Sequence, residues 1–336
     1  MLAPDFSITG RKIGGSESPY VIAEAGSNHN QSLDTAKKLI DAAAKAGCDA
    51  VKFQLFEAGE LYPPTHEYYN VFKEIELSAD WLPTLQQHAN AQGVAFLASP
   101  FDRRSVDKLA AINVPAYKIA SSETANLGLL AYIAAKGKPM IVSTGMCDMV
   151  DVMEAVACCE RNGASEVALL QCTALYPPQP ADINLAVMDT FRSSFGCPVG
   201  YSDHVLGITI AVAAAARGAA VIEKHFTLDR NSPGPDHSYA LEPGELADMV
   251  SQIRVVHSAI GDSVKDMHPE ERKVGRRDGL YAARAVAAGE RLTEDAIQSQ
   301  RPAVGIRARH RGQVVGLFAK QALAAGDAIH WKDLQP

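Results

Sequence analysis

The sequence has no membrane-spanning run, no excess of positive charge and no recognisable secretory leader. Its longest apolar candidate, Ile208 to Ile222, is broken by Arg217 and Gly218 and falls short of the roughly 18 residues that span a bilayer. The amino end shows no charged stretch followed by an apolar core and a small-residue cleavage site, so we expect a cytoplasmic protein. The net charge of −7 gives no global field for nucleic acid or an anionic membrane. We therefore expect small-molecule ligands and neither nucleic acid nor membrane as partners.

Cysteine is also used sparsely. The six cysteines are scattered without a CxxC or CxxH pattern, which argues against a disulfide framework and against a structural zinc site. We expect most of them to be buried small apolar side chains.

Along the first three quarters of the sequence, short apolar segments alternate with segments whose apolar residues recur at the spacing of a helix. Eight such segments, buried on both faces and each followed by a helix, indicate a parallel sheet that closes most economically into a (β/α)8 TIM barrel. Ser32 is expected to cap the first helix, and residues 6–15 to form a hairpin at the barrel floor. The expected strands are 20–26, 50–56, 94–101, 116–121, 139–145, 167–173, 198–204 and 221–227.

After the barrel the pattern changes. Residues 262–279 are charged and lack apolar periodicity, which is typical of a linker. Beyond them ARAVAAGERL (283–292) is echoed by KQALAAGDAI (320–329), with Gly289 matched by Gly326 and Glu290 by Asp327. The α/β chain is thus expected to consist of a barrel domain at 1–261, a linker at 262–279 and a small C-terminal β-rich module at 280–336.

Polar side chains follow nearly every expected strand, at the rim that carries the active site of TIM-barrel enzymes. Lys52 and Lys118 lie inside apolar strands, where an ammonium group is costly unless it meets an anion. Together they could hold a phosphate or carboxylate; alternatively, each pairs with a barrel carboxylate such as Glu24 or Glu123. Hydroxyl donors at neighbouring strand ends are Ser99, Ser121 and Ser143.

Glu24 and Glu123 are also candidates for general acid–base chemistry, because burial raises and a nearby lysine lowers the pKa of a carboxyl group. His204 and His225 end the short apolar runs GYSDH and VIEKH and should emerge at neighbouring strand ends. Two neutral imidazoles so placed are typical ligands of a divalent metal, with a structural pair as the alternative. Asp236 and His237, in a Gly/Pro-rich loop, could reach over the metal or bind a polyol, or lie in a solvated turn.

In this order, the motifs resemble the sialic acid synthase family, and the tail resembles the antifreeze-like, or SAF, domain. The matching stretches include IAEAGSNHNQ, PAYKIASSE, LLQCTALYP, VGYSDH, VIEKHFTLDR, PGPDH and RPAVGI. The resemblance implies a (β/α)8 barrel, a divalent metal (Mn²⁺, with Mg²⁺ or Co²⁺ as alternatives) and a domain-swapped homodimer. It also implies condensation of phosphoenolpyruvate with the open-chain aldehyde of N-acetylmannosamine, giving N-acetylneuraminate and phosphate.

The resemblance also assigns residue roles. His204 and His225 would ligate the metal, and Glu24 and Glu123 would transfer protons. Arg301 would reach the sugar from the tail of a second subunit. The residues implied to hold phosphoenolpyruvate are Lys52, Lys118, Ser99, Ser121, Ser143 and Ser202. The residues implied to meet the sugar are Gln54, Tyr176 and Asp236.

Alternatives remain open at this point. Within the family the acceptor could be a 2,4-diacetamido-trideoxy hexose, which would make the enzyme a legionaminic or pseudaminic acid synthase. Barrel enzymes that make seven- or eight-carbon sugar acids use phosphorylated sugars and would not need the tail. A non-catalytic sugar-binding barrel is disfavoured, because binding alone needs neither a metal pair nor a proton-transfer group such as Glu24.

Overall fold

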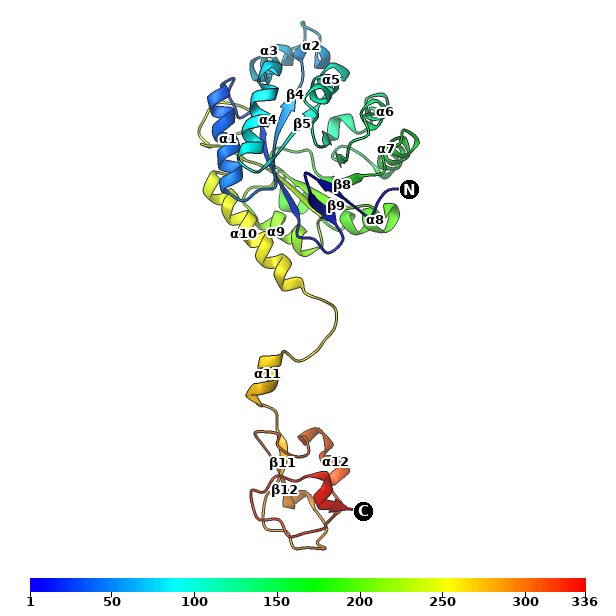
Figure 1. The fold of residues 1–336 in the computed structure, drawn as a ribbon, viewed down its shortest axis with the longest axis vertical. Helices are drawn as coiled ribbons and strands as arrows, with labels where there is room; N and C mark the ends of the chain where they lie inside the picture. The colour runs from blue at the N-terminus through cyan, green and yellow to red at the C-terminus, as the bar shows by residue number, and fades with distance from the viewer. The chain divides into compact units, whose positions relative to one another are not determined.

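The chain divides into two compact units, Met1–Gly261 and Asp262–Pro336. The computed structural model describes residues 1–336, apart from the side chain of Val274. Figure 1 shows the elements of both units. No helix in the described part of the chain is both long and apolar enough to cross a membrane. All six cysteines are free, and all except Cys147 are buried.

An eight-stranded parallel sheet with the order β5-β4-β3-β10-β9-β8-β7-β6 forms the centre of the first unit. The edge strands β5 and β6 pack against each other and close the ring. The strands are β3 (Tyr20–Gly26), β4 (Ala50–Leu55), β5 (Ala95–Pro100), β6 (Tyr117–Ile119), β7 (Met140–Ser143), β8 (Val167–Cys172), β9 (Val199–Asp203) and β10 (Val221–His225). This arrangement confirms the predicted TIM barrel.

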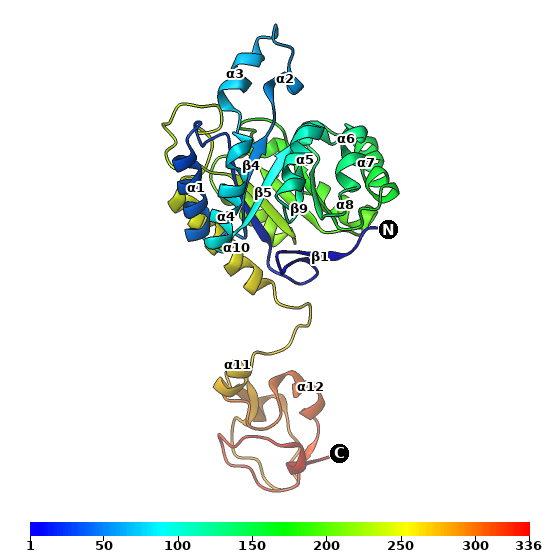
Figure 2. The ribbon, with the colours of Figure 1, turned by 45° about the horizontal axis from the view of Figure 1, so that its top comes forward.

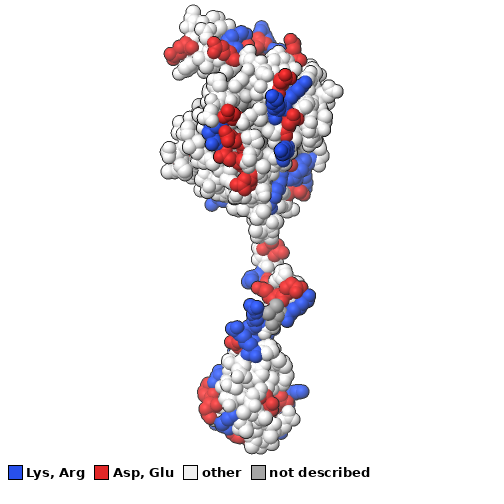
Figure 3. Space-filling view, turned by 90° about the vertical axis from the view of Figure 1, so that its left-hand side faces the viewer, with Lys and Arg blue, Asp and Glu red and all other residues white. Residues whose placement is uncertain are grey.

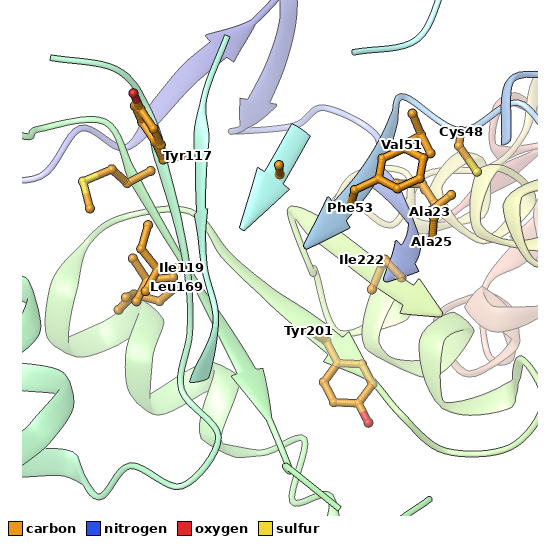
Figure 4. Close-up of a cluster of buried hydrophobic side chains, with 14 of the residues drawn as sticks. Ala23, Ala25, Cys48, Val51, Phe53, Tyr117, Ile119, Leu169, Tyr201 and Ile222 are labelled. Carbon is orange, nitrogen blue, oxygen red and sulfur yellow. The ribbon is translucent and has the colours of Figure 1, made fainter. Parts of the chain in front are cut away.

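Helices surround the sheet, and the outward side chains of the strands form a core beneath them. Val51, Phe53 and Ile222 belong to this layer, drawn in Figure 4. The predicted cap is present: the Ser32 hydroxyl accepts from the N–H of Thr35 and begins α1. The helices are α1 (Leu33–Lys45), α2 (Ala58–Leu61), α3 (Tyr68–Ile75), α4 (Leu82–Ala91), α5 (Arg103–Ala111), α6 (Leu127–Ala134), α7 (Met149–Arg161), α8 (Val187–Phe195), α9 (Thr209–Ala216) and α10 (Pro243–Ile260).

The predicted hairpin is confirmed as β1 (Asp5–Ile8) paired antiparallel with β2 (Arg11–Gly14). Its side chains Phe6, Ile8 and Ile13 pack against the inward-facing apolar residues of the barrel strands. Figure 2 shows β1 at one end of the barrel, opposite α2 and α3. The apolar plug closes the amino-terminal end of the strands, so polar chemistry is confined to their carboxyl ends.

Asp49 ties this floor together and gives the first testable prediction. Its carboxylate accepts from Arg11 Nε at 3.2 Å, from Arg254 Nη2 at 2.8 Å and from the backbone N–H of Val21 at 2.8 Å. Asp49→Ala should therefore lower the free energy of unfolding by about 2–4 kcal/mol in urea titrations, since three donors lose their acceptor. The exposed Asp41→Ala, which only removes a pair with His88, should cost less than about 0.5 kcal/mol. Equal losses would contradict the role of Asp49.

The second unit is a small antiparallel module with its own core, which includes Leu280, Val286 and Leu323. The predicted internal repeat is visible in two equivalent hydrogen bonds. The N–H of Ala287 donates to Glu290 Oε2 at 2.8 Å, and the N–H of Ala324 donates to Asp327 Oδ2 at 2.7 Å. The elements are α11 (Pro269–Val274), β11 (Gly279–Ala282), β12 (Ile297–Gln300), α12 (Arg311–Val314), β13 (Phe318–Ala319) and β14 (Leu334–Gln335). The segment expected as a linker thus contains the helix α11.

The distribution of surface charge does not indicate a polymer ligand. Figure 3 shows acidic and basic side chains interspersed over the visible face of the first unit. The functional site must be sought among buried polar groups.

Candidate active site

The carboxyl ends of the barrel strands bring the predicted lysines and serines into one buried hydrogen-bonded network. Lys52 Nζ on β4 lies 2.7 Å from Glu24 Oε2 on β3 and donates to Ser99 Oγ at 3.1 Å. Lys118 Nζ on β6 donates to Ser143 Oγ at 2.7 Å. All five side chains are buried. Both lysines therefore face the barrel interior, where they can meet an anion.

Glu223 on β10 joins the two lysines, a role that the sequence interpretation did not assign to it. Its carboxylate lies 3.4 Å from Lys118 Nζ and 3.8 Å from Lys52 Nζ, and it accepts from Ser202 Oγ at 3.0 Å. The signal that could have found it is the two-residue period of a strand, because Glu223 and His225 share the inward face of β10.

The pKa values of the two buried glutamates are shifted in opposite directions. Burial would raise the pKa of Glu223, but the nearby Lys118 and Lys52 outweigh it and lower that pKa to about 2. Burial dominates at Glu24 and raises its pKa, against the opposing effect of Lys52. Burial also lowers the pKa of Lys118. Glu223 is thus a permanent counter-charge, while Glu24 is the carboxyl group suited to exchanging a proton.

Glu123 and Ser121 lie in a short 3-10 turn after β6. In the described part of the chain Glu123 forms no ion pair with Lys52 or Lys118, and burial raises its pKa. The hydroxyl of Ser121 accepts from the N–H of Gly145 at 2.9 Å. The structure thus connects Glu24, and not Glu123, to the lysine network.

His204 and His225 lie together next to this network, with ring centroids 5.3 Å apart. His204 Nδ1 lies 3.0 Å from the carbonyl oxygen of Thr173, so a proton on Nδ1 leaves Nε2 with a free lone pair. His225 Nδ1 is buried and has no hydrogen-bond partner among the described residues. Burial is the largest cause that lowers the pKa of each ring to about 4, so both imidazoles are neutral at physiological pH.

A divalent metal is compatible with this pair. Neutral imidazoles are the form that binds a cation, and the contact from Thr173 to His204 is the kind that orients a ligand ring. Among the described residues no third His, Cys, Asp or Glu completes a metal-binding group with them. The remaining coordination positions would be left to water or substrate.

The residues implied to meet the sugar border the same imidazoles. The ring of Tyr176 lies 4.3 Å from the ring of His204. Asp236 accepts from the hydroxyl of Tyr239 at 2.7 Å and from Ser27 Oγ at 3.2 Å. Gln54 Nε2 donates to Glu24 Oε1 at 3.0 Å.

Gly26 allows the side chains of Asp236 and Gln54 to lie close to the backbone of β3. Its φ is +52°, and a Cβ there would lie 2.8 Å from Asp236 Oδ2 and 3.5 Å from Gln54 Nε2, so the position excludes any side chain. Arg301, by contrast, belongs to the second unit, where it is exposed and pairs with Asp278 at 2.8 Å.

Comparisons with known proteins agree with these features. A model of the NeuB family matches residues 39–265, and a model of the SAF domain matches residues 277–335. An uncharacterized protein of Methanocaldococcus jannaschii is 41% identical over 96% of this chain and 97% of that protein. The N,N'-diacetyllegionaminic acid synthase of Campylobacter jejuni is 39% identical over 89% of this chain and 95% of that protein. The N-acetylneuraminate-9-phosphate synthase of Mus musculus is 38% identical over 85% of this chain and 84% of that protein.

A solved structure shows the same relationship. The N-acetylneuraminic acid (sialic acid) synthetase of Leptospira borgpetersenii, in complex with citrate, has a TM-score of 0.77 at 33% identity, over 80% of this chain and 94% of that one. Its likeness confirms the barrel, and the SAF match confirms the resemblance of the tail. The chain belongs to the NeuB family.

Proposed function

We propose that this chain is a nonulosonic acid synthase that condenses phosphoenolpyruvate with N-acetylmannosamine to give N-acetylneuraminate and phosphate. The observation that carries the proposal is the buried network of Lys52, Lys118, Glu223 and Glu24 beside two neutral imidazoles. Named relatives in the family make sialic, legionaminic and pseudaminic acids. An anion cradle, a proton carrier and a cation site are the parts that such a condensation needs.

The lysines supply the anion cradle. Lys52 and Lys118 share the ionised Glu223, and Lys52 also meets Glu24. Both ammonium groups face the buried site, where they can meet the phosphate and the carboxylate of the ligand. The serine hydroxyls that already bond within the network can turn toward the ligand; they are Ser99, Ser143 and Ser202. Ser121 would add a further hydroxyl from the turn after β6. Fixed donors in a buried site stabilise the trianion throughout the reaction.

Glu24 is proposed as the proton carrier. The C3 carbon of phosphoenolpyruvate forms a bond to the aldehyde carbon, and water then adds to C2, which the loss of the enol electrons has left electron-poor. Glu24 accepts one proton of that water and returns it to the oxygen of the former aldehyde, which becomes a hydroxyl. The bond from C2 to the phosphate oxygen then breaks, C2 becomes a keto group, and the second proton of the water leaves with phosphate. The raised pKa of Glu24 makes its carboxylate a stronger base for the proton that it accepts. Glu123, whose pKa is also raised, is the second choice.

His204 and His225 would hold the divalent cation, Mn²⁺ in the first instance, which would polarise the aldehyde oxygen of the sugar. Tyr176 and Asp236 border the imidazoles, and Gln54 contacts Glu24. We propose that these three side chains orient the open-chain sugar.

A panel of acceptors tests the proposal. Phosphate release from phosphoenolpyruvate should be greatest with N-acetylmannosamine, and at least about tenfold lower in kcat/KM with its 6-phosphate or a 2,4-diacetamido-trideoxy hexose. The second candidate, a legionaminic acid synthase, is favoured by the 36% and 39% identical relatives that carry this activity in their names. A preference for the diacetamido sugar would select it. No release with any acceptor would leave a sugar-binding barrel.

The partner subunit is proposed to supply Arg301 in a domain-swapped homodimer. Arg301→Ala should then raise the KM for the sugar by at least about tenfold and change the KM for phosphoenolpyruvate by less than about twofold, as steady-state kinetics would show. Asp278→Asn is the matched control, because it breaks the pair with Arg301 but keeps the guanidinium. Equal effects of Arg301→Ala on the two KM values would argue against the swapped contact.

A further inference from the structure

The residues that directly precede the two imidazoles form a buried ion pair. We infer that this pair, Asp203 and Lys224, is a positioning device that fixes the spacing of His204 and His225. The inference rests on the proposed metal site. Neither Asp203 nor Lys224 belongs to the anion cradle.

The pair sits directly across the ladder between β9 and β10, where Asp203 and Lys224 are opposite partners. Lys224 Nζ lies 2.7 Å from Asp203 Oδ2, and the two side chains are 1% and 0% exposed. Successive side chains of a strand face opposite sides. Because Asp203 and Lys224 point toward the helices, His204 and His225 point into the barrel.

The ion pair also holds the chain immediately after His204. Asp203 Oδ1 accepts from the backbone N–H of Val205 at 2.9 Å. Lys224 Nζ donates to the carbonyl oxygen of the same residue. The peptide groups on both sides of Val205 are thus fixed by one side chain from each histidine-bearing strand. The position of His204 is therefore coupled directly to the strand that carries His225.

Folding alone does not account for this pair. Two charges taken out of water carry a large desolvation cost, and replacing such a pair with uncharged residues of similar volume is often neutral or stabilising. Register does account for it, since a slip of one residue between β9 and β10 would turn one imidazole out of the barrel. Tyr201, whose hydroxyl donates to Asp203 Oδ1 at 3.0 Å, braces the carboxylate in that register.

The test is a double variant, Asp203→Asn/Lys224→Met, assayed for Mn²⁺ binding by electron paramagnetic resonance and for Tm by calorimetry. It removes both charges, leaves neither unpaired and keeps an acceptor for the N–H of Val205. We expect a Tm within about 3 °C of the wild type and a Kd for Mn²⁺ raised about 10- to 100-fold. The matched control, Asp49→Asn/Arg254→Met at the barrel floor, should leave the Kd unchanged.

The outcomes separate the inference from the function on which it rests. A double variant that binds Mn²⁺ like the wild type overturns the inference and leaves the metal site standing. A wild-type protein that binds no Mn²⁺ overturns both. If the double variant does not fold, Tyr201→Phe, which removes only the hydroxyl that braces Asp203, decides by the same titration. A wild-type Kd in that single variant also counts against the positioning role.

Discussion

Replacing His225 with alanine is expected to abolish turnover. The loss should be at least about 1,000-fold in kcat, equivalent to about 4 kcal/mol, because one of the two imidazoles proposed to hold the cation disappears. Phosphate release and metal content, measured by mass spectrometry on the purified protein, should fall together. The reason lies in the geometry: the ring of His225 is buried 5.3 Å from that of His204, with Nδ1 unpartnered.

The control for His225→Ala is His237→Asn. His237 is equally buried, but its Nδ1 lies 2.7 Å from Thr227 Oγ1 and its Nε2 lies 3.1 Å from Asn30 Oδ1. Both ring nitrogens are therefore engaged within the protein, and the variant should retain its metal. Wild-type rates or full metal content in His225→Ala would refute the metal assignment.

Lys118→Met should cause the second large loss, in the use of phosphoenolpyruvate. Removing one partner of a buried charge pair costs about 2–5 kcal/mol. We therefore expect kcat/KM for phosphoenolpyruvate to fall by about 30- to 4,000-fold, at about 1.4 kcal/mol per factor of ten. The KM for the sugar should stay within about twofold. Initial rates with each substrate varied in turn would separate the two effects.

Two controls accompany this variant. Lys136→Met removes an exposed ion pair with Asp107 and should leave both KM values unchanged. Lys118→Met/Glu223→Gln removes both members of the buried pair and should recover part of any lost Tm without recovering the use of phosphoenolpyruvate. An unchanged KM and kcat for phosphoenolpyruvate in Lys118→Met would contradict the anion cradle.

Local signals were enough to predict the barrel strands. β3 has the predicted bounds, Tyr20–Gly26, and the other strands lie within their predicted ranges. An apolar run buried on both faces is visible without knowing its neighbours. The helices α2 and α3, between β4 and α4, were not predicted, because α3 buries none of its residues and so lacks an apolar face in the core. Aromatic contacts hold this segment together instead, such as Tyr62 with Phe72, 5.0 Å between ring centroids.

The ion pairing of the site needed the three-dimensional structure. The alternative that Lys52 pairs with Glu24 was right, because the two lie on neighbouring strands. Lys118 also pairs with a barrel carboxylate, but this is Glu223 and not the suggested Glu123. β6 and β10 are not adjacent in the sheet, so their side chains meet only across the closed barrel. A linear pattern carries no information on such a contact.

The most direct test of the whole account is anomalous diffraction from crystals soaked with Mn²⁺ and phosphoenolpyruvate. A manganese peak should lie within bonding distance of one ring nitrogen of His204 and one of His225, with the phosphate against Lys52 and Lys118. A peak at any other place, or phosphoenolpyruvate bound away from the two lysines, would contradict it.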